Sequence, residues 1–195
     1  ERVIVVERGE EIADKNGLKE GRKKIAENDF NAAEALEYFE TIPEYDDIKR
    51  LEYPLQIFQW NDEMLRRDFK YIISKKQSQK LPSGSNYINP ENIFIEEGAK
   101  VEHSILNTSS GPIYIGKNAA VMEGCIIRGP FAMCEGSVLK MGAKVYGATT
   151  LGPYCIGAGE IKNSVLFGYS NKAHDGYLGD AVIGEWCNLG AGTSN

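Results

Sequence analysis

The chain has 195 residues, of which 42% are hydrophobic, and it carries a formal net charge of −6 at pH 7. This length allows one or two domains, and the acidic balance without a large basic cluster excludes a nucleic-acid-binding surface. No apolar run approaches the ~20 residues of a membrane-spanning helix, and the first residues lack a signal-peptide pattern, so we expect a cytoplasmic protein without a membrane partner.

The composition changes near residue 81. Residues 1–80 hold 33 of the 50 charged residues but only 3 of the 21 glycines. The glycine-rich remainder suits closely spaced turns, because glycine adopts positive φ angles without steric cost. The turn-forming residues Leu81–Asn86 mark the boundary. We therefore expect two domains, at residues 1–80 and 81–195.

The first region has the pattern of a small α/β segment. Apolar residues within Arg2–Glu7 predict a buried strand, and the charged residues 11–37 favour helix. A second helix is predicted from Asn61, as its N-cap, through about Ile73. Its inner face would carry Leu65, Phe69 and Ile72. Because this core is small, we expect the segment to be the end of a larger α/β domain.

In the second region, aliphatic residues recur every six positions over seven repeats. They are Ile115, Val121, Ile127, Met133, Leu139, Val145 and Leu151. A period of six fits neither an α-helix, with its period of 3.6, nor a simple alternating strand. It indicates short strands separated by turns, wound into a solenoid whose coils bury their apolar faces by stacking.

Three hexapeptides are expected to make one coil of this solenoid. Ile115, Met133 and Leu151 would then stack along one side, as would Val121 with Leu139 and Ile127 with Val145. The period begins at Ile95, breaks at Asn107–Pro112 and slips again after Leu151. We expect loops at both slips. After the second slip, the predicted inward positions are Val165, Tyr177, Ile183 and Leu189.

The cysteines and histidines do not have the spacing of a metal site. The four cysteines, which lack a C-x-x-C pair, are expected to be buried free thiols: Cys125, Cys134, Cys155 and Cys187. The two histidines, His103 and His174, cannot supply the three histidines that a zinc site between β-helix coils requires. We therefore expect no metal site, and His103 is expected to be a surface or structural residue.

The tract Ile95–Thr193 resembles the left-handed parallel β-helix of hexapeptide acyltransferases. The segment from Lys172 to Thr193, K-A-H-D-G-Y-L-G-D-A-V-I-G-E-W-C-N-L-G-A-G-T, resembles a stretch of the bifunctional N-acetylglucosamine-1-phosphate uridyltransferase / glucosamine-1-phosphate acetyltransferase family. Glu160-Ile-Lys162 has the spacing from His174 that the family's E-M-K element has. The resemblance implies a mainly β fold, with a small α/β segment before the β-helix that ends a nucleotidyltransferase domain.

The chain starts at Glu1 and stops at Asn195, within a repeat-like phrase. We therefore expect it to be a piece of a longer protein, with a β-helix that is incomplete at its C-terminal end and with little activity on its own.

The resemblance also implies a role for each matching residue. His174 would be the catalytic base that removes a proton from the acceptor amine. Lys162 and Tyr177 would bind the sugar phosphate, Asn188 would line the pocket, and Ala191 would meet the thioester region of acetyl-CoA. A structural explanation also stays open for several of them: Lys162 as a solvated lysine, Tyr177 as a core residue and Asn188 as a turn residue.

One position departs from the family's pattern. After a phrase like Gly129-Pro-Phe-Ala132 the family has an arginine, and here the corresponding residue is a lysine, either Lys140 or Lys144. Lysine is a point charge and lacks the bidentate geometry with which arginine binds phosphate. The identity of the sugar acceptor is therefore open.

The resemblance implies a transferase of sugar-nucleotide biosynthesis. The favoured function is acetyl-CoA-dependent N-acetyl transfer to a hexosamine 1-phosphate by the β-helix, in a homotrimer whose Mg²⁺ would belong only to the nucleotidyltransferase half. The alternative is a sugar-1-phosphate uridylyl- or thymidylyltransferase whose β-helix serves only trimerisation or regulation. Either protein would bind sugar phosphates or nucleotide sugars. A purely structural assembly module would leave Lys162, His174, Tyr177 and Asn188 unexplained as a set.

Overall fold

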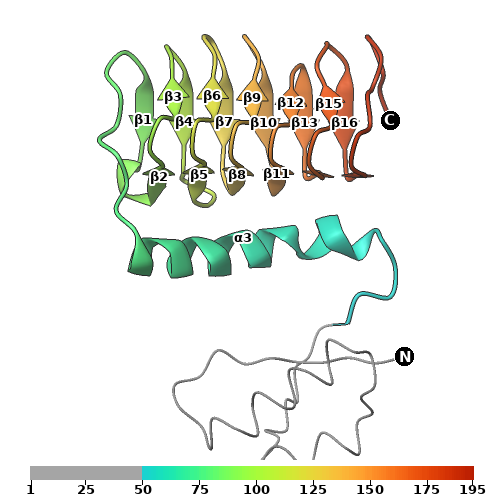
Figure 1. The fold of residues 1–195 in the computed structure, drawn as a ribbon, viewed down its shortest axis with the longest axis horizontal. Helices are drawn as coiled ribbons and strands as arrows, with labels where there is room; N and C mark the ends of the chain where they lie inside the picture. The colour runs from blue at the N-terminus through green and yellow to red at the C-terminus, as the bar shows by residue number, and fades with distance from the viewer. Residues whose placement is uncertain (1–49) are drawn as a thin grey trace, which may run out of the picture. The chain divides into compact units, whose positions relative to one another are not determined.

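The computed structural model describes residues 50–195, of which Leu51–Asn195 form one compact unit. This unit begins with helix α3 (Gln56–Lys75) and continues as a series of short parallel strands, which lie along one side of the helix (Figure 1). The predicted strand at Arg2–Glu7 and the helix-favouring residues 11–37 lie outside the described residues.

The strands form three parallel sheets, which we name A, B and C, and successive strands along the chain belong to different sheets. Sheet A contains β1 (Asn86–Ile88), β4 (Ile105–Asn107), β7 (Ile126–Arg128), β10 (Lys144–Tyr146), β13 (Glu160–Lys162) and β16 (Tyr177–Gly179). Sheet B contains β2 (Ile93–Ile95), β5 (Ile113–Ile115), β8 (Phe131–Met133), β11 (Thr149–Leu151), β14 (Val165–Leu166) and β17 (Val182–Ile183). Sheet C contains β3 (Lys100–Val101), β6 (Ala120–Val121), β9 (Val138–Leu139), β12 (Ile156–Gly157) and β15 (Asn171–Lys172).

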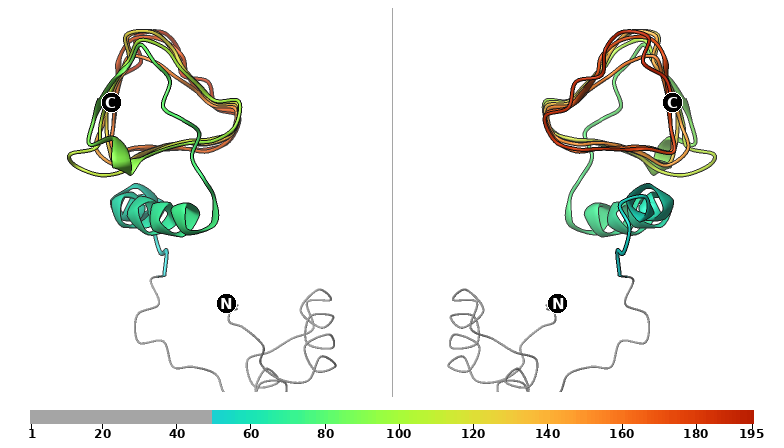
Figure 2. Two further views of the ribbon diagram at one scale, coloured as in Figure 1. Left: turned by 90° about the vertical axis from the view of Figure 1, so that its left-hand side faces the viewer. Right: turned by 90° about the vertical axis from the view of Figure 1, so that its right-hand side faces the viewer.

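Seen along the solenoid axis, the coils superpose as a triangle with one sheet on each side (Figure 2). A 3₁₀ turn, η1 (Pro90–Asn92), joins β1 to β2. The predicted mainly β fold with a parallel β-helix is therefore confirmed.

The predicted stacks of the seven-repeat tract are confirmed residue by residue. Ile115 pairs with Met133, and Met133 with Leu151. The same register joins the two further predicted pairs, Val121 with Leu139 and Ile127 with Val145. All seven side chains are at most 1% exposed. Because full burial of an aliphatic side chain contributes about 1.5–3 kcal/mol, these three stacks stabilise the solenoid strongly.

The register predicted after Leu151 is wrong at two of its four positions. Leu166, and not Val165, stacks on Leu151, while Leu178, and not Tyr177, continues the inward column of sheet A. The coils are shorter here, because four positions instead of six separate Gly157 from the next inward residue, Ile161. Each of the two misassigned residues precedes another apolar residue. Hydrophobicity alone therefore does not show which of the two neighbours points inward.

The other two predicted inward positions agree with the structure. Ile183 stacks on Leu166 in sheet B, and Leu189 packs against the apolar core. Val165 is also buried, but on the opposite face of sheet B. It pairs with Thr150, whose hydroxyl bonds to α3, so this face of the sheet is the one that the helix covers.

Helix α3 begins five residues before the predicted N-cap. Leu55 is its N-cap, and Asn61 lies inside the helix and is buried against sheet B. Its side-chain amide donates to the carbonyl of Ala148 at 2.8 Å, and its amide oxygen accepts from the hydroxyl of Thr150 at 3.0 Å. Asparagine is a favourable N-cap residue, but Asn61 instead binds helix α3 to the solenoid through these two hydrogen bonds. The predicted inner face agrees with the structure, since Phe69 is buried and its two companions are partly buried.

Replacing Asn61 tests this docking. In Asn61→Leu, the carbonyl of Ala148 and the hydroxyl of Thr150 lose their buried partner, so we expect the free energy of unfolding to fall by about 1–3 kcal/mol. Urea denaturation measures the change. The control is Lys70→Ala on the exposed face of the same helix, which should change stability by less than about 0.5 kcal/mol. Equal stability of the two variants would contradict the docking role.

Candidate functional site

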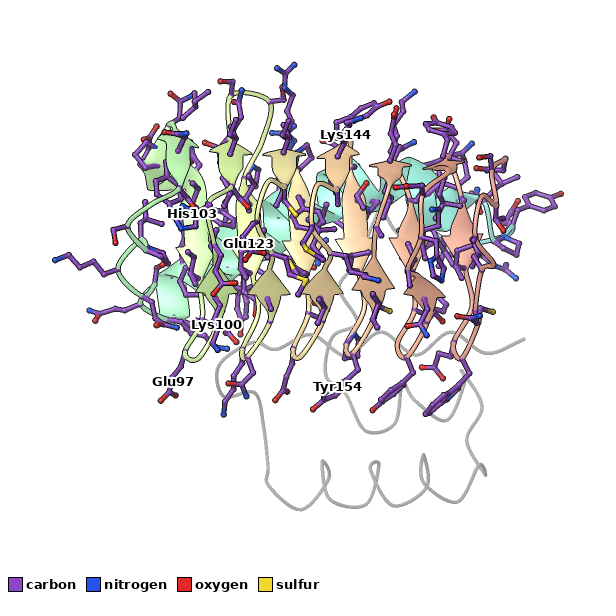
Figure 3. All side chains as sticks on the ribbon, turned by 90° about the horizontal axis from the view of Figure 1, so that it is seen from above. Glu97, Lys100, His103, Glu123, Lys144 and Tyr154 are labelled. Atoms are coloured by element: carbon purple, nitrogen blue, oxygen red, sulfur yellow. The ribbon has the colours of Figure 1, made fainter. Side chains whose placement is uncertain are left out.

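The outer face of sheet A changes from apolar to polar along the solenoid. Each three-residue strand of this sheet points its middle side chain inward and the flanking two outward. One outward row contains Ile105, Ile126, Lys144, Glu160 and Tyr177. The two isoleucines are exposed, whereas the last three members are polar side chains on consecutive coils. Figure 3 shows Lys144 extending outward from this face, away from the edge that carries Glu97 and Tyr154. A polar surface of this kind suits a charged or hydroxylated ligand.

Lys162 and Tyr177 lie on adjacent coils of this face. Glu160 pairs with Tyr177, and Lys162 pairs with Gly179. A Cβ atom at Gly179 would collide with the hydroxyl of Tyr177, so the tyrosine ring lies over this glycine. Since Gly179 is the pairing partner of Lys162, the phenol and the ammonium group occupy neighbouring places on one surface. The structure therefore brings together two of the predicted site residues.

A tyrosine that sequence reasoning missed adjoins them. Tyr146 pairs with Lys162 on the preceding coil, and its hydroxyl donates to the carboxylate of Glu160 at 2.5 Å. This hydrogen bond raises the pKa of Tyr146 to about 12, because the carboxylate stabilises the neutral phenol and repels the phenolate. The hydroxyl therefore keeps its proton at neutral pH and fixes the position of Glu160 beside Tyr177.

His174 lies at the corner between sheets C and A, three residues before Tyr177. The corner consists of residues 173–176, and His174 is exposed there. Gly159 lies at the same corner one coil earlier, where a Cβ atom would come within 2.8 Å of the carbonyl of Gly176. The two corners are thus in direct backbone contact. The earlier corner leads into Glu160 and Lys162, so His174 borders the face that carries both.

The two alternative lysines occupy different places. Lys140 donates from its ammonium group to the carbonyl of Ala173 at 3.3 Å and so contacts the corner of His174. Lys144 lies on the outer face of sheet A, where it pairs with Glu160. Lys144 is therefore the one that shares a surface with Lys162 and Tyr177.

Asn188 and Ala191 lie on the last coil. Asn188 pairs with Asn171 on the outer side of sheet C, so the structure does not place it on the surface of Lys162. Ala191 is exposed in the turn that follows, and the neighbouring amide of Gly192 donates to the carbonyl of Asp175 at 3.1 Å. Ala191 is therefore close to the corner of His174, on its C-terminal side.

Two further features differ from the expectations or were not foreseen. Of the four cysteines expected to be buried, Cys125 and Cys155 are buried, Cys134 is partly buried, and Cys187, on the last described coil, is exposed. A row of stacked rings follows the edge between sheets B and C, where Tyr154 projects outward (Figure 3). The ring centroids of Tyr154 and Tyr169 are 5.4 Å apart, and those of Tyr169 and Trp186 are 4.5 Å apart. Trp186, on the last described coil, is 74% exposed.

Neither a metal site nor a membrane span is found in the part of the chain that the structure describes. Residues 50–195 contain no group of three or more His, Cys, Asp or Glu side chains that could hold a metal ion. The helix in this part of the chain is not long and apolar enough to cross a membrane.

The chain is similar to several proteins called bifunctional protein GlmU. The alignment with that of Alkaliphilus metalliredigens extends over 176 positions at 31% identity, and it covers 77% of this chain and 36% of the relative. The alignment with that of Thermus thermophilus extends over 155 positions at 30% identity, and it covers 67% of this chain and 34% of the relative. With that of Rubrobacter xylanophilus it shares 40% identity over 99 residues, or 51% and 17%.

The alignments to the first two of these proteins span about a third of each relative's length. No family model matches the chain.

The contact between Tyr146 and Glu160 can be tested by titration. We expect Tyr146 to titrate at about 12 in the unmodified protein, and nearer 10 in Glu160→Gln, because the charge that disfavours the phenolate is then absent. The tyrosinate absorbance, taken as a difference against the same protein with Tyr146→Phe, isolates this one group. Glu102→Gln, an exposed carboxylate on an early coil, is the control. Titration of Tyr146 near pH 10 in the unmodified protein would contradict the contact.

Proposed function

Because the chain is a hexapeptide-repeat β-helix protein that resembles GlmU, we propose that the end of its sheet A is an acceptor site for acetyl transfer to the amine of a hexosamine 1-phosphate. One observation carries the proposal. Lys162 and Tyr177 lie on adjacent coils of one outer face, directly beside the corner that presents His174.

In this reaction the acceptor is an amino sugar, whose ammonium form must lose a proton before its nitrogen can attack. The imidazole of His174 takes that proton, because a neutral imidazole can act as a general base. A C–N bond then forms and the C–S bond of the thioester breaks. Lys162 binds the acceptor's phosphate, with Lys144 as a second positive charge on the same face. Tyr177 provides a ring and a hydroxyl that orient the sugar beside His174.

Acetyl-CoA supplies the acetyl group and a thiolate leaving group. The residues present fit its reactive end, because the turn that contains Ala191 lies next to the corner of His174 and has only small side chains. The backbone of Ala191 would hold the thioester region there. Asn188, on the outer side of sheet C, would contact the cofactor and not the sugar.

The proposal for the whole protein is a homotrimeric transferase of sugar-nucleotide biosynthesis, in which a nucleotidyltransferase domain uses Mg²⁺. A second candidate is a nucleotidyltransferase whose β-helix serves only trimerisation or regulation. Asp175 favours this candidate, since an exposed carboxylate next to His174 would repel an anionic sugar phosphate.

The chain contains a matched pair of histidines with which to test the base. In the whole protein, His174→Ala should lower kcat for acetylation of glucosamine 1-phosphate by about a hundredfold or more, because general-base catalysis is lost. His103 is also exposed at a corner between sheets C and A, but at the start of the solenoid, so His103→Ala should leave kcat unchanged. Coenzyme A release in steady-state assays measures both. Unchanged turnover in His174→Ala would exclude this histidine as the base.

Phosphate binding by Lys162 is tested separately. Lys162→Met should raise KM for the sugar phosphate about tenfold and change kcat little, because it removes a charge that binds substrate and transition state alike. The matched control is Lys100→Met on an early coil of sheet C, for which we expect native kinetics. The two variants having equal KM values would be incompatible with a phosphate contact at Lys162.

A further inference from the structure

A lysine occupies an inward position in the core of the solenoid. The inward column of sheet C consists of Val101, Val121, Leu139, Gly157 and Lys172. Lys172 has no exposed surface and is among the largest fully buried side chains of the described residues. Burying an ammonium group is strongly unfavourable unless its hydrogen bonds are made inside the protein. Any role for this residue should therefore follow from the groups that it binds.

The ammonium group of Lys172 binds two backbone carbonyls at the corners between sheets C and A. It donates to the carbonyl of His174 at 2.5 Å and to that of Ala158, one coil earlier, at 3.4 Å. Hydrogen bonds from a charged donor are shorter and stronger than neutral ones. One buried cation thus ties together the two corners that border the outer face of sheet A.

The packing below Lys172 leaves its side chain little freedom. Its pairing partner in the previous coil is Gly157, where a Cβ atom would come within 3.1 Å of the side chains of both Leu139 and Leu151. The aliphatic part of the lysine therefore lies on a filled apolar layer. This burial lowers the pKa of Lys172, and the nearby carboxylate of Asp175 acts in the opposite direction.

Lysines hold successive carbonyls of this corner. Lys172 binds the carbonyl of His174, and Lys140, two coils earlier, binds that of Ala173. The two peptide groups that flank the Cα atom of His174, one on each side, are thus both held by a lysine. At the corner of His103 the carbonyl accepts instead from a backbone amide, that of Gly124 in the next coil.

We propose that Lys172 is a positioning residue for His174: by holding the carbonyl of His174 from inside the core, it fixes the corner at which the imidazole meets the acceptor bound on sheet A. This inference rests on the proposed acetyl transfer for its consequence, but the fixation of the corner is a separate property. A displacement of about 1 Å at a reacting group lowers rates by up to about a hundredfold, so such support matters to a base.

The test replaces Lys172 with methionine, which fills a similar volume without a donor. In the whole protein carrying Lys172→Met, we expect kcat for acetylation to fall tenfold or more, with KM for the sugar phosphate within about twofold of native, because the acceptor's own contacts are intact. Hydrogen exchange of the amides at residues 173–176 should become faster in the same variant. The matched control is Leu139→Met, from the same inward column two coils earlier, for which we expect native kcat and native exchange.

The two readouts separate the possible failures. Native kcat and native exchange in Lys172→Met would overturn the inference and leave the lysine as core filling. Loss of activity in His174→Ala but not in Lys172→Met would also overturn it, while acetyl transfer stood. Faster exchange at residues 173–176 in a protein without acetyltransferase activity would support the fixation of the corner and would refute the proposed function.

A measurement on the unmodified protein keeps the inference testable if Lys172→Met fails to fold. In nuclear magnetic resonance spectra, an exposed lysine ammonium exchanges too fast to be seen, whereas that of Lys172 should be protected. We expect a slowly exchanging ammonium signal with a coupling across the hydrogen bond to the carbonyl carbon of His174. If the Lys172 ammonium exchanges as fast as that of Lys100, the hydrogen bond does not exist and the inference is wrong.

Discussion

The rest of the structure depends on the vertical stacking of one inward side chain per sheet in every coil. In the column Ile115, Met133 and Leu151, each side chain lies directly on the next and none is exposed. The backbone hydrogen bonds between coils hold the same register, so that the position of every outward residue follows from that of its inward neighbour. Groups far apart in sequence, such as Tyr146 and Lys162, are thereby fixed next to each other without any loop having to be ordered.

The candidate site arises where this regular stacking is modified. The corner between Gly157 and Ile161 is two residues shorter than the regular corners, and it lies in backbone contact with the full-length corner of His174 on the next coil. At the same level the inward column of sheet C changes from an aliphatic residue to glycine and then to Lys172. The shortened corner and the buried cation occur together, beside the polar end of sheet A. Regular coils thus provide the scaffold, and the irregular coils carry the groups that can bind or react.

The sequence predicted the fold well where a single phase of the repeat was possible. From Ile115 to Leu151 the period of six continues through seven repeats without a break, which selects one phase even where the neighbouring residue is also apolar, as at Ile126 and Val138, and the stacks were predicted correctly. Beyond Leu151 the pairs Val165-Leu166 and Tyr177-Leu178 are apolar at both positions, so that hydrophobicity could not show which member points inward. Asn61 was misread for a related reason, since its side chain can cap a helix end as well as bond a neighbouring sheet.

The candidate site was predictable only in part. The resemblance selected His174, Lys162 and Tyr177, which the structure gathers at one end of sheet A and its adjoining corner. Tyr146 was missed because its relation to Glu160 depends on the coil length. Lys172 was missed because a lysine is not expected inside a core, although counting six residues on from Leu166 would have pointed to it.

The most direct measurement of the central claim is a nuclear magnetic resonance titration of the protein with glucosamine 1-phosphate. We expect the signals of Lys162, Tyr177 and His174 to shift together along one binding curve, while those of His103 and Lys100 stay in place. Shifts confined to the early coils, or none at the three site residues at saturating ligand, would contradict the placement of an acceptor site at this end of sheet A.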